Sequence, residues 1–235
     1  MKKLGIAAGT IFLKEPLFED MERKTVETVF GTATVFLAGN AVFLPRHGID
    51  RNHYILPHLI NHRANMQALK ELDVAAVIGV NSTGSLKRDL APGTIVIPHD
   101  FIALSPMQTV FHDRDAHVPP NLDEALRKKL IAATVPRQSA TVPSGVYWQT
   151  TGPRYETRAE IQMMANYADI VGMTMAGEAV ICCEIGLPYA ALCSVDNYAH
   201  GVSNNVLSIK AVQEAARQNA RRIAPIIKNF LASYS

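Results

Sequence analysis

The 235-residue sequence contains only three cysteines, and two of them, Cys182 and Cys183, are direct neighbours. The third is Cys193. An odd count with two adjacent members does not form a disulfide framework, and it shows no metal-ligand spacing. We expect these side chains to be small buried apolar groups in a reducing compartment rather than redox or metal groups.

Long hydrophobic runs are also missing. No apolar stretch approaches the roughly 18 residues that a membrane-spanning helix needs. The N-terminal stretch MKKLGIAAGTIFL has too short an apolar part for a signal peptide or a membrane anchor, and it is interrupted at Gly9-Thr10. We therefore expect a cytoplasmic protein without a membrane partner.

The sequence lacks an excess of one charge, because 23 Lys and Arg residues stand against 21 Asp and Glu residues and the net charge is +2. It has no basic run, and aromatic residues make up only 7% of the chain, so few of them stand among cations. Nucleic acids bind basic surfaces, so this composition argues against a nucleic-acid partner.

What the sequence does have is apolar content, 48% of all residues, enough to bury a large core. Its length suits one α/β domain, and no linker or repeat divides it, so we expect a single domain over residues 1–235. Continuous apolar runs typical of strands buried on both faces occur at residues 3–8, 74–80, 94–98, 169–173 and 189–195. Helical spacing occurs at residues 59–72, 122–133, 159–167 and 208–231.

Strands that alternate with helices predict a three-layer α/β/α fold with a central mixed β-sheet. Residues 32–45, TATVFLAGNAVFLP, add a hairpin that turns near Gly39-Asn40. In such folds ligands bind at the carboxyl ends of strands, so the polar residues at these ends are the candidates for a functional site.

Three strand ends carry groups that suit an anion. Thr10 follows the first run beside Gly9, where a hydroxyl adjoins accessible backbone N–H groups. Arg46 and His47 follow the hairpin, and a guanidinium is a natural partner of phosphate. Residues 81–85, NSTGS, follow the second run. Each has an ordinary reading as a turn, a surface salt bridge or a solvated loop, but three candidate walls in one chain favour an anion cradle.

Two later strand ends add candidates for binding a sugar and a base. Met173 and Thr174 end one run, and Met173 suits packing beneath a sugar ring, although a methionine in a core is more common. Asp196 and Asn197 end another run, where a helix cap or a turn is the alternative. Residues 151–160, TGPRYETRAE, place cations, a ring and carboxylates after a turn-forming Gly-Pro, so this segment is either a solvated helix entry or a polar clamp.

Two histidines have a spacing that suits a metal site. His58 and His62 are four residues apart, which places them on one face of a helix. No third ligand follows at a suitable spacing, so we expect solvated or capping histidines and no bound metal.

In sequence order the chain carries AAGT, LPRHG, INHRAN, NSTGSL, PGTIVIPHDFI, HVP, TGPRYET, VGMTMAGEA and SVDNYAHG. This series resembles the purine nucleoside phosphorylase and methylthioadenosine phosphorylase family, in its trimeric branch, over nearly the whole chain. The resemblance implies a nucleoside phosphorylase-like fold and cleavage of a purine from ribose by inorganic phosphate, leaving a ribose 1-phosphate, with no metal or organic cofactor. It also implies a homotrimer, or a hexamer built from two trimers.

The same resemblance implies a role for each site residue. Phosphate would be bound by Thr10, Arg46, His47, Asn81, Ser82 and Thr174. The base would be bound by Tyr155, Glu156 and Asn197. The ribose and its 5′ group would be contacted by Met173, Ile209 and His117 of a neighbouring subunit. In the catalytic step Asn197 would donate to purine N7 as charge builds there, and Arg46 with His47 would hold the nucleophile.

Base and sugar preferences follow from four positions. A 6-oxopurine carries a proton on N1 where adenine has a lone pair, so an ionised Glu156 favours the 6-oxopurine. Adenine-specific members resemble each other in placing acids at the positions of Asn197 and Ala199, and this sequence has neither. An apolar Ile209 packs a methylthio group better than a hydroxyl. The expected substrate is therefore 5′-methylthioinosine or another 6-oxopurine nucleoside.

Three other functions stay open at this point: a 5′-methylthioadenosine phosphorylase, a hydrolytic nucleosidase and a non-catalytic nucleoside sensor. The sequence also departs from the family pattern. Ala8 and Ile11 stand where glycine is usual, Gly177 stands where proline is expected, and Asp196 stands where the family usually has threonine. We expect Asp196 to alter the local charge beside Asn197.

Overall fold

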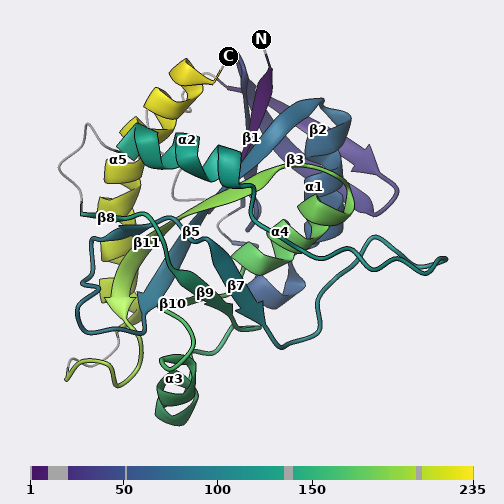
Figure 1. Cartoon of the computed structure of the whole chain (residues 1–235). Helices are drawn as coiled ribbons and strands as arrows, with labels where there is room; N and C mark the ends of the chain where they lie inside the picture. The colour runs from purple at the N-terminus through teal and green to yellow at the C-terminus, as the bar shows by residue number, and fades with distance from the viewer. Residues whose placement is uncertain (1, 10–20, 51, 135–139, 205–207, 235) are drawn as a thin grey trace.

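The computed structural model describes residues 2–9, 21–50, 52–134, 140–204 and 208–234 (Figure 1). Its strands are β1 (Lys3–Ala8), β2 (Glu22–Thr28), β3 (Gly31–Ala38), β4 (Ala41–Pro45), β5 (Val74–Ser85), β6 (Ile95–Val96), β7 (Asp100–Ala103), β8 (Thr141–Val142), β9 (Val146–Gln149), β10 (Ile170–Gly172) and β11 (Tyr189–Tyr198). Its helices are the 3-10 helix η3 (Pro57–Leu59) and α1 (His62–Glu71), α2 (Glu124–Thr134), α3 (Arg158–Met164), α4 (Met175–Glu184) and α5 (Ile209–Ser233).

The strands form one mixed sheet in the order β2-β3-β4-β1-β5-β10-β9-β7, while β11 pairs with β5 and carries β6 and then β8. The inner strands β4, β1, β5 and β11 are parallel to one another. The arm β2-β3-β4 is antiparallel, and β10 is antiparallel to β5. The mixed central sheet expected from the sequence is confirmed, and it brings the carboxyl ends of the inner strands to one edge.

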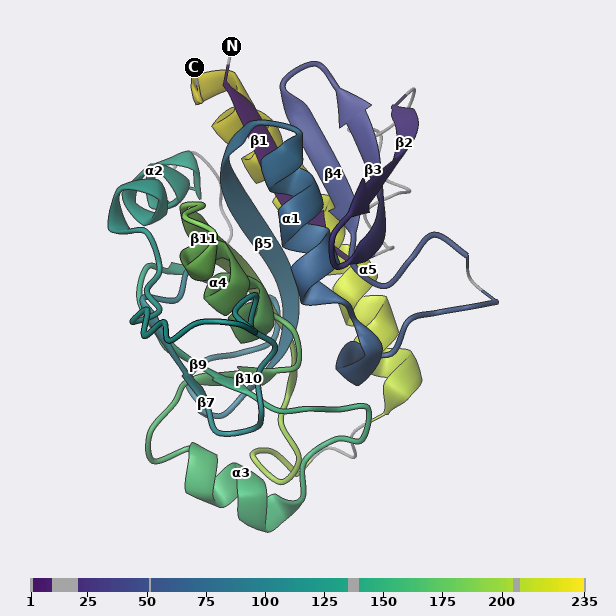
Figure 2. The same ribbon diagram turned by 90° about the vertical axis from the view of Figure 1, so that its right-hand side faces the viewer.

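Helices cover both faces of this sheet, as Figure 2 shows. α1 and α4 pack together on one face, and α2 packs with α5 on the other. Side chains alternate along a strand, so Ile6 of β1 belongs to the apolar cluster of Phe230 in α5, whereas Ala7 belongs to the cluster of Leu69 in α1. These two cores on opposite faces confirm the three-layer α/β/α architecture.

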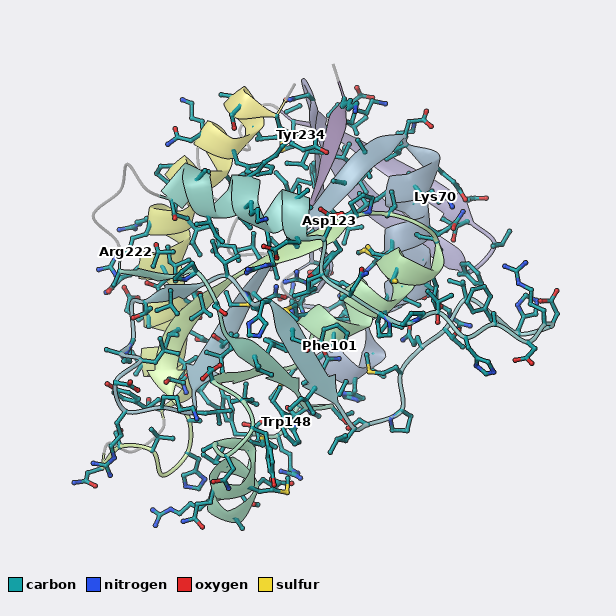
Figure 3. The ribbon with its side chains drawn as sticks, viewed as in Figure 1. Lys70, Phe101, Asp123, Trp148, Arg222 and Tyr234 are labelled. Carbon is teal, nitrogen blue, oxygen red and sulfur yellow. The ribbon has the colours of Figure 1, made fainter. Side chains whose placement is uncertain are left out.

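A third and smaller core lies under α3. Trp148 of β9 packs there with Ile161 and Met164 of α3, and Figure 3 shows Trp148 between its strand and this helix. The core attaches α3 to the β9 and β10 end of the sheet, which positions the loop that enters the helix.

Most of the expected elements are present with shifted ends. The expected hairpin is confirmed as β3 and β4, and Gly39 takes a φ of 55° in its turn. Residues 81–85, expected after a strand, are the last part of β5, because they pair with β10 and β11. The expected strand at 94–98 is reduced to the two residues of β6. The terminal helix continues through Pro225.

Four strands were not identified from the sequence. β2 is the outermost strand and reads ERKTVET, of which only Val26 is buried, so it carries little apolar signal. β7, β8 and β9 have between two and four residues, too few for a period of two to be visible.

The cysteines match the expectation in part. Cys182 and Cys193 are fully buried free thiols. Cys183 is partly exposed, and its Sγ lies 3.5 Å from the carbonyl oxygen of Pro119. In the portions of the chain that the structure describes, we find no helix with both the length and the apolar character to cross a membrane.

Candidate active site

A cavity of about 300 Å³ lies where the carboxyl ends of β1, β4, β5, β10 and β11 come together. The loop before α3 and the first half of α5 complete its wall. The predicted site residues that line it are Arg46, His47, Asn81, Ser82, Tyr155, Glu156, Met173, Thr174 and Asn197. Thr10 lies outside the described residues, and its neighbour Gly9 lines the cavity. The residues predicted to bind phosphate and those predicted to bind the base therefore share one cavity.

Arg46 is almost fully buried at the wall of this cavity. Its Nε and Nη2 donate to the carboxylate of Glu178 at 2.5 and 3.1 Å, and Nη1 and Nη2 also donate to the carbonyls of Val80 and Ala7. Burial opposes the charged form, but the Glu178 carboxylate outweighs it and raises the pKa of Arg46. Among the described residues, these bonds use four of the five guanidinium N–H groups. One N–H therefore remains for an anion, which is too few for a bidentate contact.

Glu178 is the charge partner that the sequence analysis missed. It has no exposed surface, and it also accepts a hydrogen bond from the Tyr189 hydroxyl at 2.8 Å. Gly79 leaves room for this contact, since a Cβ there would lie 1.9 Å from the Tyr189 oxygen. A glutamate inside the otherwise apolar helix MAGEAVICCE was the available signal, because charged residues are rarely buried without a partner.

His47 is neutral in this structure. Burial and the adjacent charge of Arg46 lower the pKa of His47 to about 4. Its Nδ1 lies 2.8 Å from the carbonyl oxygen of Ile55, which assigns the proton to Nδ1, and its ring stacks on Tyr54 with centroids 4.5 Å apart. Nε2 is therefore an acceptor, and it becomes a donor to an anion only when the ring gains a second proton.

Asn81 and Thr174 form a hydrogen bond in the cavity wall, from Thr174 Oγ1 to Asn81 Oδ1 at 3.0 Å. The amide Nδ2 of Asn81 is buried and has no hydrogen-bond partner among the described residues. Leaving a buried donor unpaired costs about 1 to 3 kcal/mol. This N–H group is therefore a candidate ligand for an anion.

The N-terminus of α4 is capped by β9 rather than directed at a ligand. The backbone N–H groups of Thr174 and Met175 donate to the Tyr147 hydroxyl at 3.1 and 3.4 Å, and that of Ala176 donates to Gln149 Oε1 at 2.6 Å. The candidate anion ligands in this cavity are therefore strand-end side chains rather than the helix terminus.

The segment TGPRYETRAE divides its charged residues between a helix cap and the cavity. Arg154 binds both carboxylate oxygens of Glu160, at 2.8 and 2.7 Å, and Thr157 forms a capping box with the same glutamate. These contacts begin α3 and leave Tyr155 and Glu156 lining the cavity. Both readings of the segment, a helix entry and a polar wall, therefore apply to different residues in it.

Gly152 brings this loop against Met173. Its φ of 65° lies in the left-handed region, and a Cβ at this position would lie 2.6 Å from Met173 Sδ. The loop that carries Tyr155 and Glu156 thus also packs on the methionine predicted to support the sugar.

Two polar groups stand at the other end of the cavity. Glu156 is buried and accepts a hydrogen bond from the Thr150 hydroxyl at 2.6 Å. Asn197 Nδ2 donates to the carbonyl oxygen of Tyr198 at 2.8 Å, so in the described part of the chain one of its two N–H groups remains. Gly84 lies beside this amide, and a Cβ there would lie 3.3 Å from Asn197 Nδ2.

Asp196 lines the same cavity next to Asn197. β11 shifts register against β5 between Val195 and Asn197, so Asp196 is an extra residue whose side chain does not alternate to the other face. Its carboxylate accepts hydrogen bonds from the Ser82 hydroxyl and, at 2.7 Å, from the Asn219 amide of α5. Burial raises the pKa of Asp196, although these hydrogen bonds oppose the rise.

Ile209 does not line the cavity in the described structure. It is 65% exposed at the first position of α5. Val212, Gln213 and Ala216 line the cavity instead. Residues three and four positions apart share a helix face, so the periodicity of the last helix would have identified these neighbours.

His117 lies on the segment between β7 and α2, which extends away from the body of the molecule (Figure 1). Its side chain is 91% exposed, and Nε2 lies 2.9 Å from Asp115 Oδ1. It does not belong to its own chain's cavity lining among the described residues. The predicted contribution to a neighbouring subunit stays a prediction.

Gly177, which stands where a proline was expected, lies against His62. A Cβ at position 177 would lie 2.7 Å from Cδ2 of His62, so a proline ring and this imidazole exclude each other. His62 is buried, and its Nδ1 has no hydrogen-bond partner in the described ranges. Burial and the charge of Arg46 lower the pKa of His62 to about 3.

The two histidines considered for a metal do not act together. His58 lies in η3 and is exposed, whereas His62 is buried at the start of α1. Within the described residues, no group of three His, Cys, Asp or Glu side chains is placed to hold a metal ion.

Residues 7–232 match the Phosphorylase superfamily, and the chain belongs to this superfamily of enzymes. A relative from Archaeoglobus fulgidus named "Probable 6-oxopurine nucleoside phosphorylase" is 40% identical over 96% of this chain and 94% of its own. A relative from Methanocaldococcus jannaschii named "Probable S-methyl-5′-thioinosine phosphorylase" is 35% identical over 97% and 91%. The methylthioadenosine phosphorylase of Schistosoma mansoni in complex with adenine superposes with a TM-score of 0.91 and 27% identity, over 99% of this chain and 91% of that chain. The family resemblance is confirmed.

Proposed function

We propose that this enzyme is a pentosyltransferase that cleaves a purine nucleoside by phosphorolysis to the free purine and a ribose 1-phosphate. The substrate is 5′-methylthioinosine or another 6-oxopurine nucleoside, inorganic phosphate is the co-substrate, and no metal or organic cofactor takes part. One observation carries the proposal: a single cavity is lined both by Arg46 with His47 and by Glu156 with Asn197.

Phosphate binding rests on groups at the ends of β4 and β5. Arg46 supplies its remaining N–H, and the unpaired Nδ2 of Asn81 supplies another. An arriving dianion favours the protonated form of His47, which turns Nε2 into a donor. The hydroxyls of Thr10, Ser82 and Thr174 complete the set. Together they hold an oxyanion near the anomeric carbon of a sugar packed on Met173.

The base preference rests on Glu156 and Asn197. The Thr150 hydroxyl donates to one oxygen of Glu156, and the carboxylate accepts N1–H of a 6-oxopurine. Adenine would place a lone pair against it. Asn197 has an amide N–H for O6, and the apolar Ala199 behind it offers no acceptor to an amino group. The names of the Archaeoglobus and Methanocaldococcus relatives support the same substrate class.

The 5′ end of the sugar meets α5. Val212 and Ala216 present apolar surface to the cavity, which suits a methylthio group, and Gln213 adds an amide beside them. These residues, rather than Ile209, form the wall at the 5′ end. His117 of a neighbouring subunit closes this end in a homotrimer, or in a hexamer of two trimers. Its high exposure and its absence from the described lining of its own cavity support this arrangement. The enzyme works in the cytoplasm in purine salvage.

The test is an assay of base release from 5′-methylthioinosine, inosine, guanosine and 5′-methylthioadenosine, each with and without phosphate. We expect release that depends on phosphate, fastest for 5′-methylthioinosine, with formation of the matching ribose 1-phosphate. Arg46→Ala and Asn197→Ala each lower kcat/KM, and the matched control Asp50→Asn, at an exposed position, leaves it unchanged.

Each adverse result removes a different part of the proposal. Release that is equally fast without phosphate means that the enzyme is a hydrolase. Faster turnover of 5′-methylthioadenosine overturns the base assignment and identifies a methylthioadenosine phosphorylase. Binding of all four nucleosides without release identifies a sensor.

A further inference from the structure

We propose that Asp196 is the general acid of this reaction: it protonates purine N7 as the glycosidic bond breaks, and the Ser82 hydroxyl passes a proton back to it from the phosphate side. The inference rests on the proposed function. It is drawn from the contacts of Asp196 and from the hydrogen bonding of its neighbour Asn197.

The leaving group needs a proton that Asn197 does not supply. A purine that leaves with the electron pair of the C1′–N9 bond is an anion until it is protonated. Asn197 is a neutral amide, and one of its two N–H groups is bound to the Tyr198 carbonyl at 2.8 Å. The family resemblance assigned N7 to Asn197, but under the proposed function we place its one remaining N–H on O6 of the base, so the proton for N7 comes from a second group of the protein.

Asp196 is placed to be that group. The register shift of β11 turns it into the cavity beside Asn197, so both residues line one space. Its carboxyl group is only 3% exposed, which favours the neutral acid. After the proton leaves, Ser82 and Asn219 each donate to one carboxylate oxygen and stabilise the conjugate base.

The other titratable groups around Asp196 have other partners. His47 lies at the phosphate side against Ile55. His200 lies with Nδ1 3.2 Å from the Glu156 carbonyl. Burial raises the pKa of the Tyr155 hydroxyl, which makes it a weaker acid.

The strand and helix that pack on the carboxyl group present no competing charge to it. From β5 its partner is Ser82, and from α5 it is Asn219, and neither side chain ionises. On its own strand, burial raises the pKa of Cys193 above its ordinary value. Among these groups Asp196 is the carboxyl group that lines the cavity directly beside Asn197.

The step balances because Ser82 returns a proton to Asp196. The C1′–N9 bond breaks with its electron pair on the purine, and the proton of Asp196 forms the N7–H bond. A phosphate oxygen forms the new bond to C1′, and the product still carries the proton of the hydrogen phosphate. That proton passes to the Ser82 oxygen while the Ser82 hydroxyl proton passes to Asp196. The products are neutral purine and dianionic ribose 1-phosphate, and the acid is restored.

The test compares a nucleoside that needs N7 protonation with one that does not. The substrates are the better of inosine and 5′-methylthioinosine, and its N7-methyl derivative, whose base leaves as a neutral molecule. We expect Asp196→Asn to lower kcat by about 10²- to 10⁴-fold for the first substrate, the usual range for a general acid, and by less than about threefold for the second. Asp50→Asn is the matched control and changes neither.

A second readout separates an acid from a structural residue. In the wild type, kcat falls at high pH as the acid loses its proton, and in Asp196→Asn this fall disappears. Equal losses on both substrates with an unchanged pH profile mean that Asp196 only supports the fold, and unchanged turnover of both means that it has no part in the step. Either result overturns the acid role. If the proposed function itself is wrong, the wild-type enzyme already fails to release the base in a phosphate-dependent way.

Discussion

At the scale of single residues, the site is built from buried charges that neutralise each other. Arg46 and Glu178 form an ion pair in which both partners are nearly inaccessible, and Tyr189 holds the second carboxylate oxygen. The pair keeps the guanidinium charged and fixed in position. It also leaves little net positive charge on the pair, so under the proposed function we expect binding of a phosphate dianion to be coupled to protonation of His47.

Glu178→Gln is predicted to lower the free energy of unfolding by about 3 to 5 kcal/mol, because it leaves the buried Arg46 charge without its counter-ion. Urea unfolding followed by circular dichroism measures this change. Tyr189→Phe is the matched control, since it removes one hydrogen bond to the same carboxylate and costs about 1 kcal/mol. Equal losses in the two variants would show that the ion pair is not what stabilises this region.

The double substitution Asn197→Asp with Ala199→Asp is predicted to move base preference toward adenine. Carboxylates at these two positions add acceptors for the N6 amino group of adenine, and an unpaired polar contact is worth about 1 to 3 kcal/mol, or roughly one to two powers of ten in preference. The measurement is the ratio of kcat/KM for 5′-methylthioadenosine and 5′-methylthioinosine. A ratio that stays at the wild-type value would contradict our account of base selection.

At the scale of elements, the contact between α1 and α4 is made by His62 against Gly177. The imidazole is buried with an unpaired Nδ1, so it is neutral when the chain is folded. The same holds for His47 at the end of β4, where burial lowers the pKa to about 4. Both histidines protonate freely in the unfolded chain, near pH 6.5.

Stability in the absence of ligands is predicted to fall as the pH decreases from about 6.5 toward 4. The folded pKa values, about 4 for His47 and about 3 for His62, lie below the ordinary value, so the unfolded state takes up more protons in this window. Each group contributes up to about 1.4 kcal/mol per pH unit. Denaturant midpoints measured across this range test the slope.

His62→Phe is predicted to reduce that slope by about half, because one of the two groups no longer titrates. The exposed His58→Phe is the control and leaves the slope unchanged. A slope that is the same in His62→Phe and in the wild type would mean that His62 is not neutral in the folded protein.

The elements also show where sequence reasoning succeeds and where it stops. Arg46 and Asn197 were found because each ends an apolar run, and parallel strands bring such ends to one edge. The pairings of Arg46 with Glu178 and of Asp196 with Ser82 were not predicted, because the partners lie 132 and 114 residues apart and only the strand order brings them together. Thr10, a prediction from the same reasoning, lies outside the described residues.

At the scale of the whole molecule, the oligomer is predicted to be necessary for full activity. His117 lies on a segment that extends from the body of the chain, and its exposed side chain is free to reach another subunit. Mixed oligomers of His117→Ala and Arg46→Ala subunits are predicted to regain part of the activity that each variant lacks alone, because some sites then combine two intact contributions. Light scattering gives the subunit number, and the activity of refolded mixtures gives the complementation. Mixtures no more active than the average of their parents would contradict a shared site.

α5 joins the cavity to the interior. Its first half lines the cavity through Val212 and Ala216, and its second half fills one core through Ile223 and Phe230. One continuous helix thus lines the cavity with its first half and the core with its second, and Ala220 contacts both regions. Natural or laboratory variation ahead of that residue can retune which nucleosides are accepted while the anchoring half keeps the chain folded.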